Sequence, residues 1–345
     1  MFFLILSLLS LIILLVASFN IKYKEIRWNW DEIDIDNLSF PKSFMWGTAT
    51  ASHQVEGLCK NNWFEFEKGR KKNGEPNIKD SQLSGLACDH WNRYKEDINL
   101  ITQLGVNHYR FSLEWSKIEP KTGEYNTQAL KHYSDLIDKL IQNDIEPVIT
   151  LHHFSHPVWF DELGAFEKTE NIAYLLSFSK RVFDEYSDRV KYWCTINEPG
   201  VVAVQGYFTG MFPPGVQNGK RTAQVFKNLL ESHVQIYHAL KNHKNGPNAQ
   251  IGIVKNINQF EPWRRYHILD WLFTISMNHI FNWSTINFFK TGKLKFRVPG
   301  LMWLTHTNIK SKNSLDFFGL NYYSHNHIKF NPFRKDFSDL KYYPL

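Results

Sequence analysis

Short apolar runs alternate with longer amphipathic stretches along most of the chain after residue 40. Residues 91–104 show the spacing clearly, because their apolar side chains recur on one helical stripe and Gly105 follows where a helix usually ends. The same criterion predicts six strands, at residues 44–52, 108–115, 146–151, 192–197, 250–254 and 315–321. It predicts five long helices, at residues 91–104, 126–143, 171–186, 222–241 and 272–289.

This alternation predicts an α/β protein with a buried parallel sheet. The chain contains neither a G-x-G-x-x-G nor a G-x-x-x-x-G-K-[ST] turn, so the pattern does not favour a dinucleotide or nucleotide fold. A TIM (β/α)8 barrel fits better, and about six of its eight strand–helix units are accounted for by the predicted elements. We therefore expect an incomplete barrel.

The N-terminus differs from the rest of the chain, since residues 1–18 contain no charged side chain. Such a helix is just long enough to cross a hydrocarbon layer, and it is followed by Lys22, Lys24 and Arg27. Two interpretations remain open: an uncleaved membrane anchor, or a signal peptide whose removal would give a secreted protein. The predicted organisation is a hydrophobic anchor or signal peptide at 1–20, a linker at 21–38 and a partial barrel domain at 39–345.

Composition narrows the class of protein. Of 345 residues, 43% are hydrophobic and 21% are charged, which is typical of a globular chain. The net charge of +6 is spread along the chain without a dense Lys/Arg block, so nothing indicates a nucleic-acid partner. Three cysteines in this length exclude a disulfide scaffold.

Polar side chains follow the predicted strands. In a barrel of parallel strands, such residues meet at the C-terminal rim, where catalytic groups lie. Amide, imidazole, guanidinium, phenol and carboxyl groups together suit a ligand with many hydroxyl groups, each of which needs a donor or an acceptor. The residues concerned, within or directly after these strands, are His53, Gln54, Glu56, Arg110, Glu114, His152, His153, Asn197, Glu198, Asn321, Tyr322 and Tyr323.

Five motifs carry a resemblance to a known family. They are FPKSFMWGTATASHQVEG (40–57), YRFSLEWSKIEP (109–120), TLHHFSHPVWF (150–160), WCTINEP (193–199) and FFGLNYYS (317–324). In this order the segments resemble glycoside hydrolase family 1, the β-glucosidase family, from about residue 39 to 324.

The resemblance implies retaining hydrolysis of β-glycosidic bonds, with a β-glycoside or oligosaccharide as substrate. In that family the Glu of T-x-N-E-P is the general acid/base, which here is Glu198. Asn197 would contact the sugar 2-hydroxyl, and Arg110 and Tyr323 would orient the nucleophile. The remaining sugar contacts implied are Gln54, His153 and Asn321.

Several residues also have simpler interpretations. Arg110 could pair with a buried carboxylate such as Glu114. His152, His153 and His156 do not form a convincing metal site, because adjacent histidines on an extended segment point to opposite faces. No metal or organic cofactor is implied, since two carboxyl groups and water suffice for the reaction.

The main departure from the family pattern is the absence of a second catalytic carboxyl group. The family's nucleophile is a Glu in a T-E-N-G-like motif on the seventh strand, and no such motif occurs in this chain. Only Asp336 and Asp339 supply carboxylates after Tyr323, so the nucleophile is expected to be absent. We expect little or no hydrolysis by this chain alone. The alternative function is a non-catalytic, membrane-tethered glycosidase-like binding protein or a decayed gene product.

Overall fold

The structure is a computed structural model that describes residues 2–25, 29–298 and 302–331. Arg27, Asp336 and Asp339 lie outside these residues. The chain divides into two compact units, which are described separately. The first comprises Met1–Phe44, Ile257–Ser284 and Tyr322–Leu345, and the second comprises Met45–Asn256 and Thr285–Asn321.

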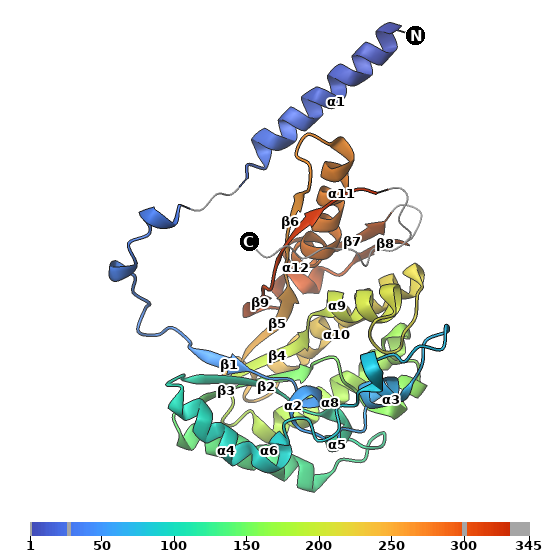
Figure 1. Ribbon diagram of the computed structural model, residues 1–345. Coiled ribbons are helices and arrows are strands. Elements are labelled where there is room, and N and C mark those ends of the chain that lie inside the picture. Colours follow the sequence, from blue (N-terminus) through green and yellow to red (C-terminus); the bar gives the residue numbers. More distant parts are fainter. Residues whose placement is uncertain (1, 26–28, 299–301, 332–345) are drawn as a thin grey trace. The chain divides into compact units, whose positions relative to one another are not determined.

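The second unit is built on a six-stranded parallel sheet (Figure 1). Its strand order, β1-β2-β3-β4-β5-β9, has no reversal, as expected for consecutive strands of a barrel wall and not for a doubly wound sheet. All five strand pairs are parallel. The strands are β1 (Gly47–Ala49), β2 (His108–Ser112), β3 (Glu146–His152), β4 (Tyr192–Asn197), β5 (Gln250–Asn256) and β9 (Phe317–Asn321). The predicted six strands and incomplete barrel are confirmed.

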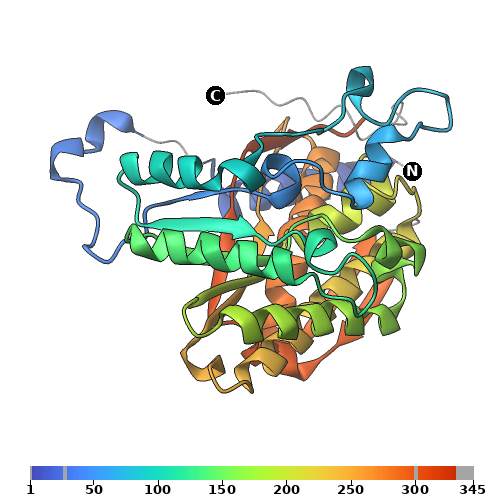
Figure 2. The same ribbon diagram turned by 90° about the horizontal axis from the view of Figure 1, so that it is seen from below.

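Long amphipathic helices connect these strands, as the periodicity predicted (Figure 2). The helix α6 begins where the Asn126 side chain accepts hydrogen bonds from the backbone N–H groups of Gln128 and Ala129. The helix α4 is followed by Gly105, which has a φ of 71°, a left-handed conformation that glycine adopts without strain. The long helices are α4 (His90–Gln103), α6 (Thr127–Gln142), α8 (Ile172–Tyr186) and α10 (Gly219–Lys241).

Shorter elements complete this unit. An antiparallel hairpin, which the sequence analysis did not predict, pairs β7 (Lys293–Val298) with β8 (Met302–Thr307). The short helices are α2 (Ser52–Val55), α3 (Asn62–Lys68), α5 (Trp115–Ile118), α7 (Val158–Glu162) and α9 (Pro199–Val204), with a π-helical turn at Gln205–Thr209. The 3-10 turns are Lys79–Ser81, Ala165–Glu167, Thr169–Asn171, Gly246–Asn248 and Ile309–Asn313.

The predicted helix at 272–289 is confirmed, with a π-helical turn in its middle. The structure has α11 (Ile268–Asn278), a π-helical turn at His279–Trp283 and α12 (Ser284–Thr291). Asn282 lies in the π-helical turn, where its side chain donates to the Asn258 carbonyl at 2.7 Å and accepts from the Asn258 N–H at 3.3 Å. These bonds tie the turn to a neighbouring segment, and a helix commonly widens to i→i+5 bonding at such a point.

The first unit contains two further strands and the apolar N-terminal helix. β6 (Gln259–Pro262) pairs in parallel with β10 (His325–Ile328), although more than sixty positions separate them along the chain. The helix α1 (Phe2–Lys22) has no buried residue and is long and apolar enough to cross a membrane. Both a signal sequence and an anchor have these properties. Two 3-10 turns, Trp30–Glu32 and Ile35–Asn37, follow it.

Candidate active site

The C-terminal ends of the parallel strands carry most of the predicted site residues. Arg110 lies in β2, Asn197 is the last residue of β4, and Asn321 is the last residue of β9. His153 directly follows β3, and Gln54 lies in α2, which begins shortly after β1. Because neighbouring parallel strands end at the same edge of the sheet, five residues distant in sequence lie along one rim.

A hydrogen-bonded cluster of amide and guanidinium groups forms the centre of this rim. The Arg110 Nη2 donates to Asn197 Oδ1 at 2.7 Å, and its Nε donates to Thr150 Oγ1 at 2.8 Å. The Asn321 Nδ2 donates to the same Asn197 oxygen at 3.3 Å. Two donors from one planar guanidinium, each to a different strand, hold Arg110 in a defined orientation. The sequence analysis did not identify Thr150 as a partner.

Glu198 lies beside this cluster and is 4% exposed. Its backbone N–H donates to the Val254 carbonyl at 2.7 Å, and its φ of 50° places it in the left-handed region at the start of α9. A non-glycine residue in this region is strained by about 1 to 3 kcal/mol, and such strain is common at functional sites. Pro199 follows as the first helical residue, and the Glu198 side chain makes no cap bond to the helix. Its Oε1 instead accepts from Asn321 Nδ2.

Lys255 is a part of this region that the sequence analysis missed. It lies in β5, is 1% exposed, and its Nζ donates to the Asn256 carbonyl. Burial lowers the pKa of the Lys255 ammonium to about 7, an effect that the Glu198 carboxylate partly opposes. The available signal was a lysine within the apolar run QIGIVKN, where a charged residue is uncommon.

The His153 imidazole is poised for contact with a polar ligand. Among the described residues its buried Nδ1 has no hydrogen-bond partner. Burial, with a smaller contribution from Arg110, lowers the pKa of His153 to about 3, so the ring is neutral near pH 7. A neutral imidazole offers one donor and one acceptor, which suits a sugar hydroxyl. His152 is buried against Phe166 and His156, which indicates a structural role.

Three predicted site residues, His153, Gln54 and Tyr323, do not take part in the hydrogen bonds that join Arg110, Asn197, Asn321 and Glu198. Gln54 is exposed at the start of α2, where its amide is accessible to a ligand. Tyr323 is 72% exposed and belongs to the first unit, whereas the other residues that the family resemblance assigns to the site belong to the second.

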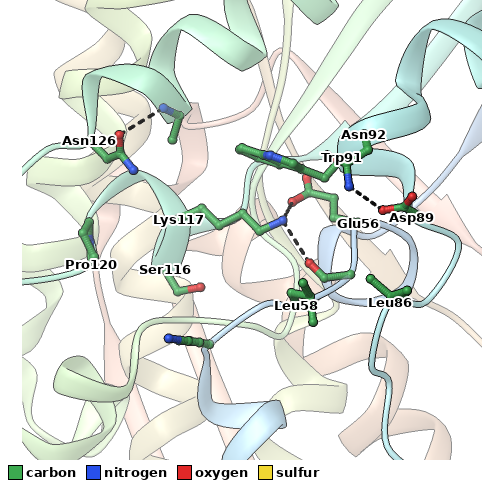
Figure 3. Close-up of a pocket in the computed structure, with 13 residues that line it drawn as sticks. Glu56, Leu58, Leu86, Asp89, Trp91, Asn92, Ser116, Lys117, Pro120 and Asn126 are labelled. Atoms are coloured by element: carbon green, nitrogen blue, oxygen red, sulfur yellow. Dashed lines mark hydrogen bonds and ion pairs between the residues drawn. The ribbon is translucent and has the colours of Figure 1, made fainter.

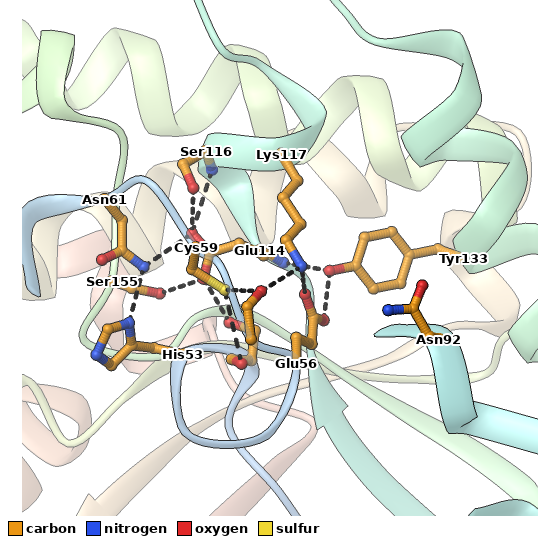
Figure 4. A network of polar contacts seen from close by, with 12 residues as sticks. His53, Glu56, Cys59, Asn61, Asn92, Glu114, Ser116, Lys117, Tyr133 and Ser155 are labelled. Atoms are coloured by element: carbon orange, nitrogen blue, oxygen red, sulfur yellow. Dashed lines mark hydrogen bonds and ion pairs between the residues drawn. The ribbon is translucent and has the colours of Figure 1, made fainter. Parts of the chain in front are cut away.

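Glu114 does not pair with Arg110, as the simpler interpretation of Arg110 had suggested. It is fully buried next to the rim, and four side chains donate to its carboxylate within 3.2 Å (Figure 4). The donors are Ser52, Asn61, Ser116 and Ser155. These bonds satisfy a buried charge and fasten the segment after β1 to the segment after β3, which stabilises the shape of the rim.

A second buried carboxyl group, Glu56, extends the same network (Figure 4). The Tyr133 hydroxyl donates to its Oε1 at 2.6 Å, and Lys117 Nζ lies 3.1 Å from its Oε2. Burial raises the pKa of Glu56 to about 7, although the Lys117 charge opposes the shift.

This ion pair borders a pocket of about 410 Å³ (Figure 3). Trp91 and Leu86 contribute apolar walls, and the Lys117 ammonium lies 3.9 Å from the centre of the Trp91 ring. None of the residues that the family resemblance assigns to the site lines the pocket. The pocket is therefore separate from the candidate active site at the strand ends.

Comparison with known proteins connects this geometry to one family. Residues 36–340 match the family described as Glycosyl hydrolase family 1. The chain is 33% identical to beta-glucosidase A of Thermotoga maritima, over 85% of this chain and 67% of that protein. It is 32% identical to a 6-phospho-beta-galactosidase of Clostridium acetobutylicum, over 84% of this chain and 64% of that protein.

Solved structures agree with the sequence matches. A family 1 β-glucosidase from Thermotoga maritima superposes with a TM-score of 0.76 at 33% identity, covering 86% of this chain and 68% of that one. A beta-glycosidase from Pyrococcus horikoshii superposes with a TM-score of 0.74 at 34% identity, and the superposition covers 85% of this chain and 65% of that one. The chain thus spans about two thirds of the length of these relatives. With the motifs in order along an incomplete parallel barrel, this chain belongs to glycosyl hydrolase family 1.

Proposed function

We propose that the protein acts on β-glycosidic bonds in carbohydrate metabolism, with Glu198 as general acid/base. The observation that carries the proposal is the buried Glu198 carboxyl at the end of β4, hydrogen-bonded to Asn321 and flanked by the Arg110–Asn197 cluster. Membership of glycosyl hydrolase family 1 supports the same reaction class.

The chemistry assigned to Glu198 has two steps. Its protonated carboxyl donates a proton to the leaving glycosidic oxygen as the bond to the anomeric carbon breaks. In the family's reaction a second carboxylate, which is not among the residues that the family resemblance assigns to this site, displaces the leaving group and forms a glycosyl ester. The Glu198 carboxylate would then remove a proton from the water that breaks this ester, so the group returns to its first state. Both steps need a carboxyl that is not used to cap its own helix, and the Glu198 side chain makes no such cap bond.

The neighbouring groups are proposed to recognise the sugar. Arg110 and Asn321 both donate to the Oδ1 of Asn197, so the Asn197 amide nitrogen is the group to donate to the sugar 2-hydroxyl. The neutral His153 imidazole and the exposed Gln54 amide would bind other hydroxyls, and Asn321 would hold Glu198 in place. Arg110 and Tyr323 are assigned to orient a nucleophile.

Retention requires a second carboxyl group about 5 to 5.5 Å from the first. Among the residues that the family resemblance assigns to the site, Glu198 is the only carboxylic acid. We therefore propose sugar binding at the rim as the property of this chain to test first, and hydrolysis as the second.

The first experiment is calorimetric titration of the purified full chain in detergent with phenyl β-glucoside and with phenyl α-glucoside. The expected result is binding of the β-anomer with preference over the α-anomer, weakened at least about ten-fold by Asn197→Ala, which removes one hydrogen bond to the sugar. The control variant Asn92→Ala changes an exposed asparagine on α4 and should bind like wild type. Equal affinity for both anomers, or none for either, would overturn the proposal.

The second experiment is hydrolysis of an aryl β-glucoside by wild type, Glu198→Gln and the control Glu96→Gln, whose carboxylate is exposed and pairs with Arg93. Any turnover by wild type should be lost in Glu198→Gln and retained in Glu96→Gln. Turnover that survives Glu198→Gln unchanged would refute the assigned role. Family-level turnover lost in this variant would mean that the chain supplies its own second carboxylate.

We also propose that α1 anchors the protein to a membrane, since none of its residues is buried and most of them are apolar. Carbonate washing of a membrane fraction should leave a C-terminally tagged protein in the pellet at full length. A soluble, shortened product would instead identify a cleaved signal peptide.

A further inference from the structure

The two-stranded sheet of the first unit brings together three side chains of the kinds that bind transition metals. His325 and His327 alternate along β10 and therefore point to the same face. The parallel register sets Glu261 of β6 opposite His327. One potential ligand atom from each residue lies within 4.8 Å of those of the other two.

The local geometry favours metal binding by these three side chains, because they do not satisfy one another with hydrogen bonds. The His325 Nε2 is buried and, among the described residues, has no hydrogen-bond partner. Its distance to the Glu261 Oε2 is 3.8 Å, too long for a hydrogen bond. The two imidazole rings are only 4.6 Å apart between centroids, so both nitrogens and the carboxylate surround one small volume.

Neighbouring groups already position the carboxylate. The Gln259 Nε2 donates to Glu261 Oε1 at 3.2 Å, and Arg265 Nη1 lies 3.6 Å from Oε2. Arg265 also donates to Asn20 Oδ1 at 3.0 Å and to the Tyr23 carbonyl, so its charge is shared among several acceptors. A carboxylate has about four lone-pair positions, so Glu261 retains the capacity to bind a metal.

We propose that Glu261, His325 and His327 form a divalent metal site that binds Zn²⁺, with water at the fourth position. Two imidazoles and one carboxylate are an established type of zinc ligand set. Ligands at about 2.0 to 2.1 Å from zinc are about 3.3 Å apart in a tetrahedron. The three side chains would therefore close by roughly 1.5 Å around the ion, a movement within the reach of their χ angles. The bound ion would cross-link β6 and β10.

The sequence analysis assigned no metal and did not consider these three residues as a set. His325 and His327 lie more than sixty positions after Glu261, and only the pairing of β6 with β10 brings them together. The proposal is independent of the proposed glycosidase activity.

The test uses the untagged full chain in detergent, treated with a chelator and then titrated with ZnCl₂ in a calorimeter. One equivalent of Zn²⁺ should bind and raise the thermal midpoint, since a ligand that binds only the folded state stabilises it. His325→Ala, His327→Ala and Glu261→Gln should each lower the Zn²⁺ affinity at least about ten-fold. Even a residue that only hydrogen-bonds to a metal ligand typically costs about ten-fold in affinity when it is changed, so the loss of a ligand itself should cost at least as much. MgCl₂ should not compete, because Mg²⁺ prefers oxygen ligands.

The matched control is His306→Ala, which removes a histidine that lies 2.7 Å from Glu231. This variant should bind Zn²⁺ like wild type. Should a ligand variant unfold, the visible absorption of Co²⁺ bound to the wild-type chain provides a second measurement and should indicate four-coordination with imidazole. The proposal fails if Zn²⁺ does not bind stoichiometrically, or if folded ligand variants bind it as tightly as wild type.

Discussion

Replacing Lys255 by methionine should stabilise the protein at neutral pH. The Lys255 side chain is 1% exposed, and burial lowers its pKa from an ordinary value of 10.5 to about 7. Methionine retains the length and flexibility of the side chain but carries no charge. The substitution therefore removes the energetic penalty for burying an ammonium group.

The size of the effect follows from the two pKa values. A change from 10.5 to about 7 corresponds to roughly 5 kcal/mol when the folded state is fully protonated, at about 1.36 kcal/mol for each pH unit. At pH 7 about half of the folded molecules carry the charge, so the penalty is roughly 4 kcal/mol. Loss of the hydrogen bond from Nζ to the Asn256 carbonyl offsets about 1 to 1.5 kcal/mol. The net expectation is an increase of roughly 2 to 3 kcal/mol in the free energy of unfolding.

The pH dependence of the stability difference shows whether the buried Lys255 charge is its cause. Below pH 7 both folded and unfolded states hold the proton, so the penalty is fully present. As the pH rises from about 7 to 10.5 the folded state has already lost the proton that the unfolded state still binds, and the stability of wild type should increase. The advantage of Lys255→Met over wild type should therefore be largest at or below pH 7 and should decrease steadily as the pH rises toward 10.5, where only the loss of the hydrogen bond remains.

The assay is urea unfolding of the full chain in detergent at several pH values, followed by far-ultraviolet circular dichroism. Lys290→Met is the control, since Lys290 is exposed at the end of α12 and its replacement should change stability by less than about 0.5 kcal/mol. A Lys255→Met protein that is less stable than wild type at pH 7, with a difference that does not vary with pH, would refute this reasoning.

Three further changes test the buried network and the rim. Tyr133→Phe removes the hydroxyl that donates to Glu56 at 2.6 Å and accepts from the Glu114 N–H at 2.8 Å, so urea unfolding should show a loss of about 2 to 4 kcal/mol; an unchanged midpoint would contradict this. Because burial raises the pKa of Glu56 to about 7, the folded state binds more protons than the unfolded state from pH 4.5 to 7. Wild-type stability should fall by up to about 3 kcal/mol over that interval, and Glu56→Gln should lack this decrease. Arg110→Lys cannot donate to both strands with a planar fork, and should lower stability by about 1 kcal/mol and weaken β-glucoside binding; equal binding in calorimetry would argue against the orienting role of the guanidinium.

Hydrophobic periodicity predicted the sheet well because each buried strand is a short apolar run that ends in polar residues. The predicted strand at 192–197 coincides with β4, and the predicted helix at 126–143 contains α6. Where long-range contacts are made, the prediction was less detailed: residues 272–289 are helical as predicted, but the segment includes a π-helical turn at His279–Trp283, in which Asn282 bonds to Asn258. Nothing in the local sequence specifies that contact.

In the candidate site, too, the sequence predicts the positions of residues along the chain, whereas long-range contacts decide their partners. The sequence by itself determined which residues follow the strands, and therefore that Arg110, Asn197, Glu198 and Asn321 reach one rim, since parallel strands end together. Only the tertiary structure decided that Arg110 bonds to Asn197 and Thr150. It also decided that Lys255 is buried near Glu198, and that two histidines face Glu261 across the β6–β10 pair. Periodicity along a chain specifies the face on which a side chain lies, whereas its partner across that face depends on which distant segments pack together.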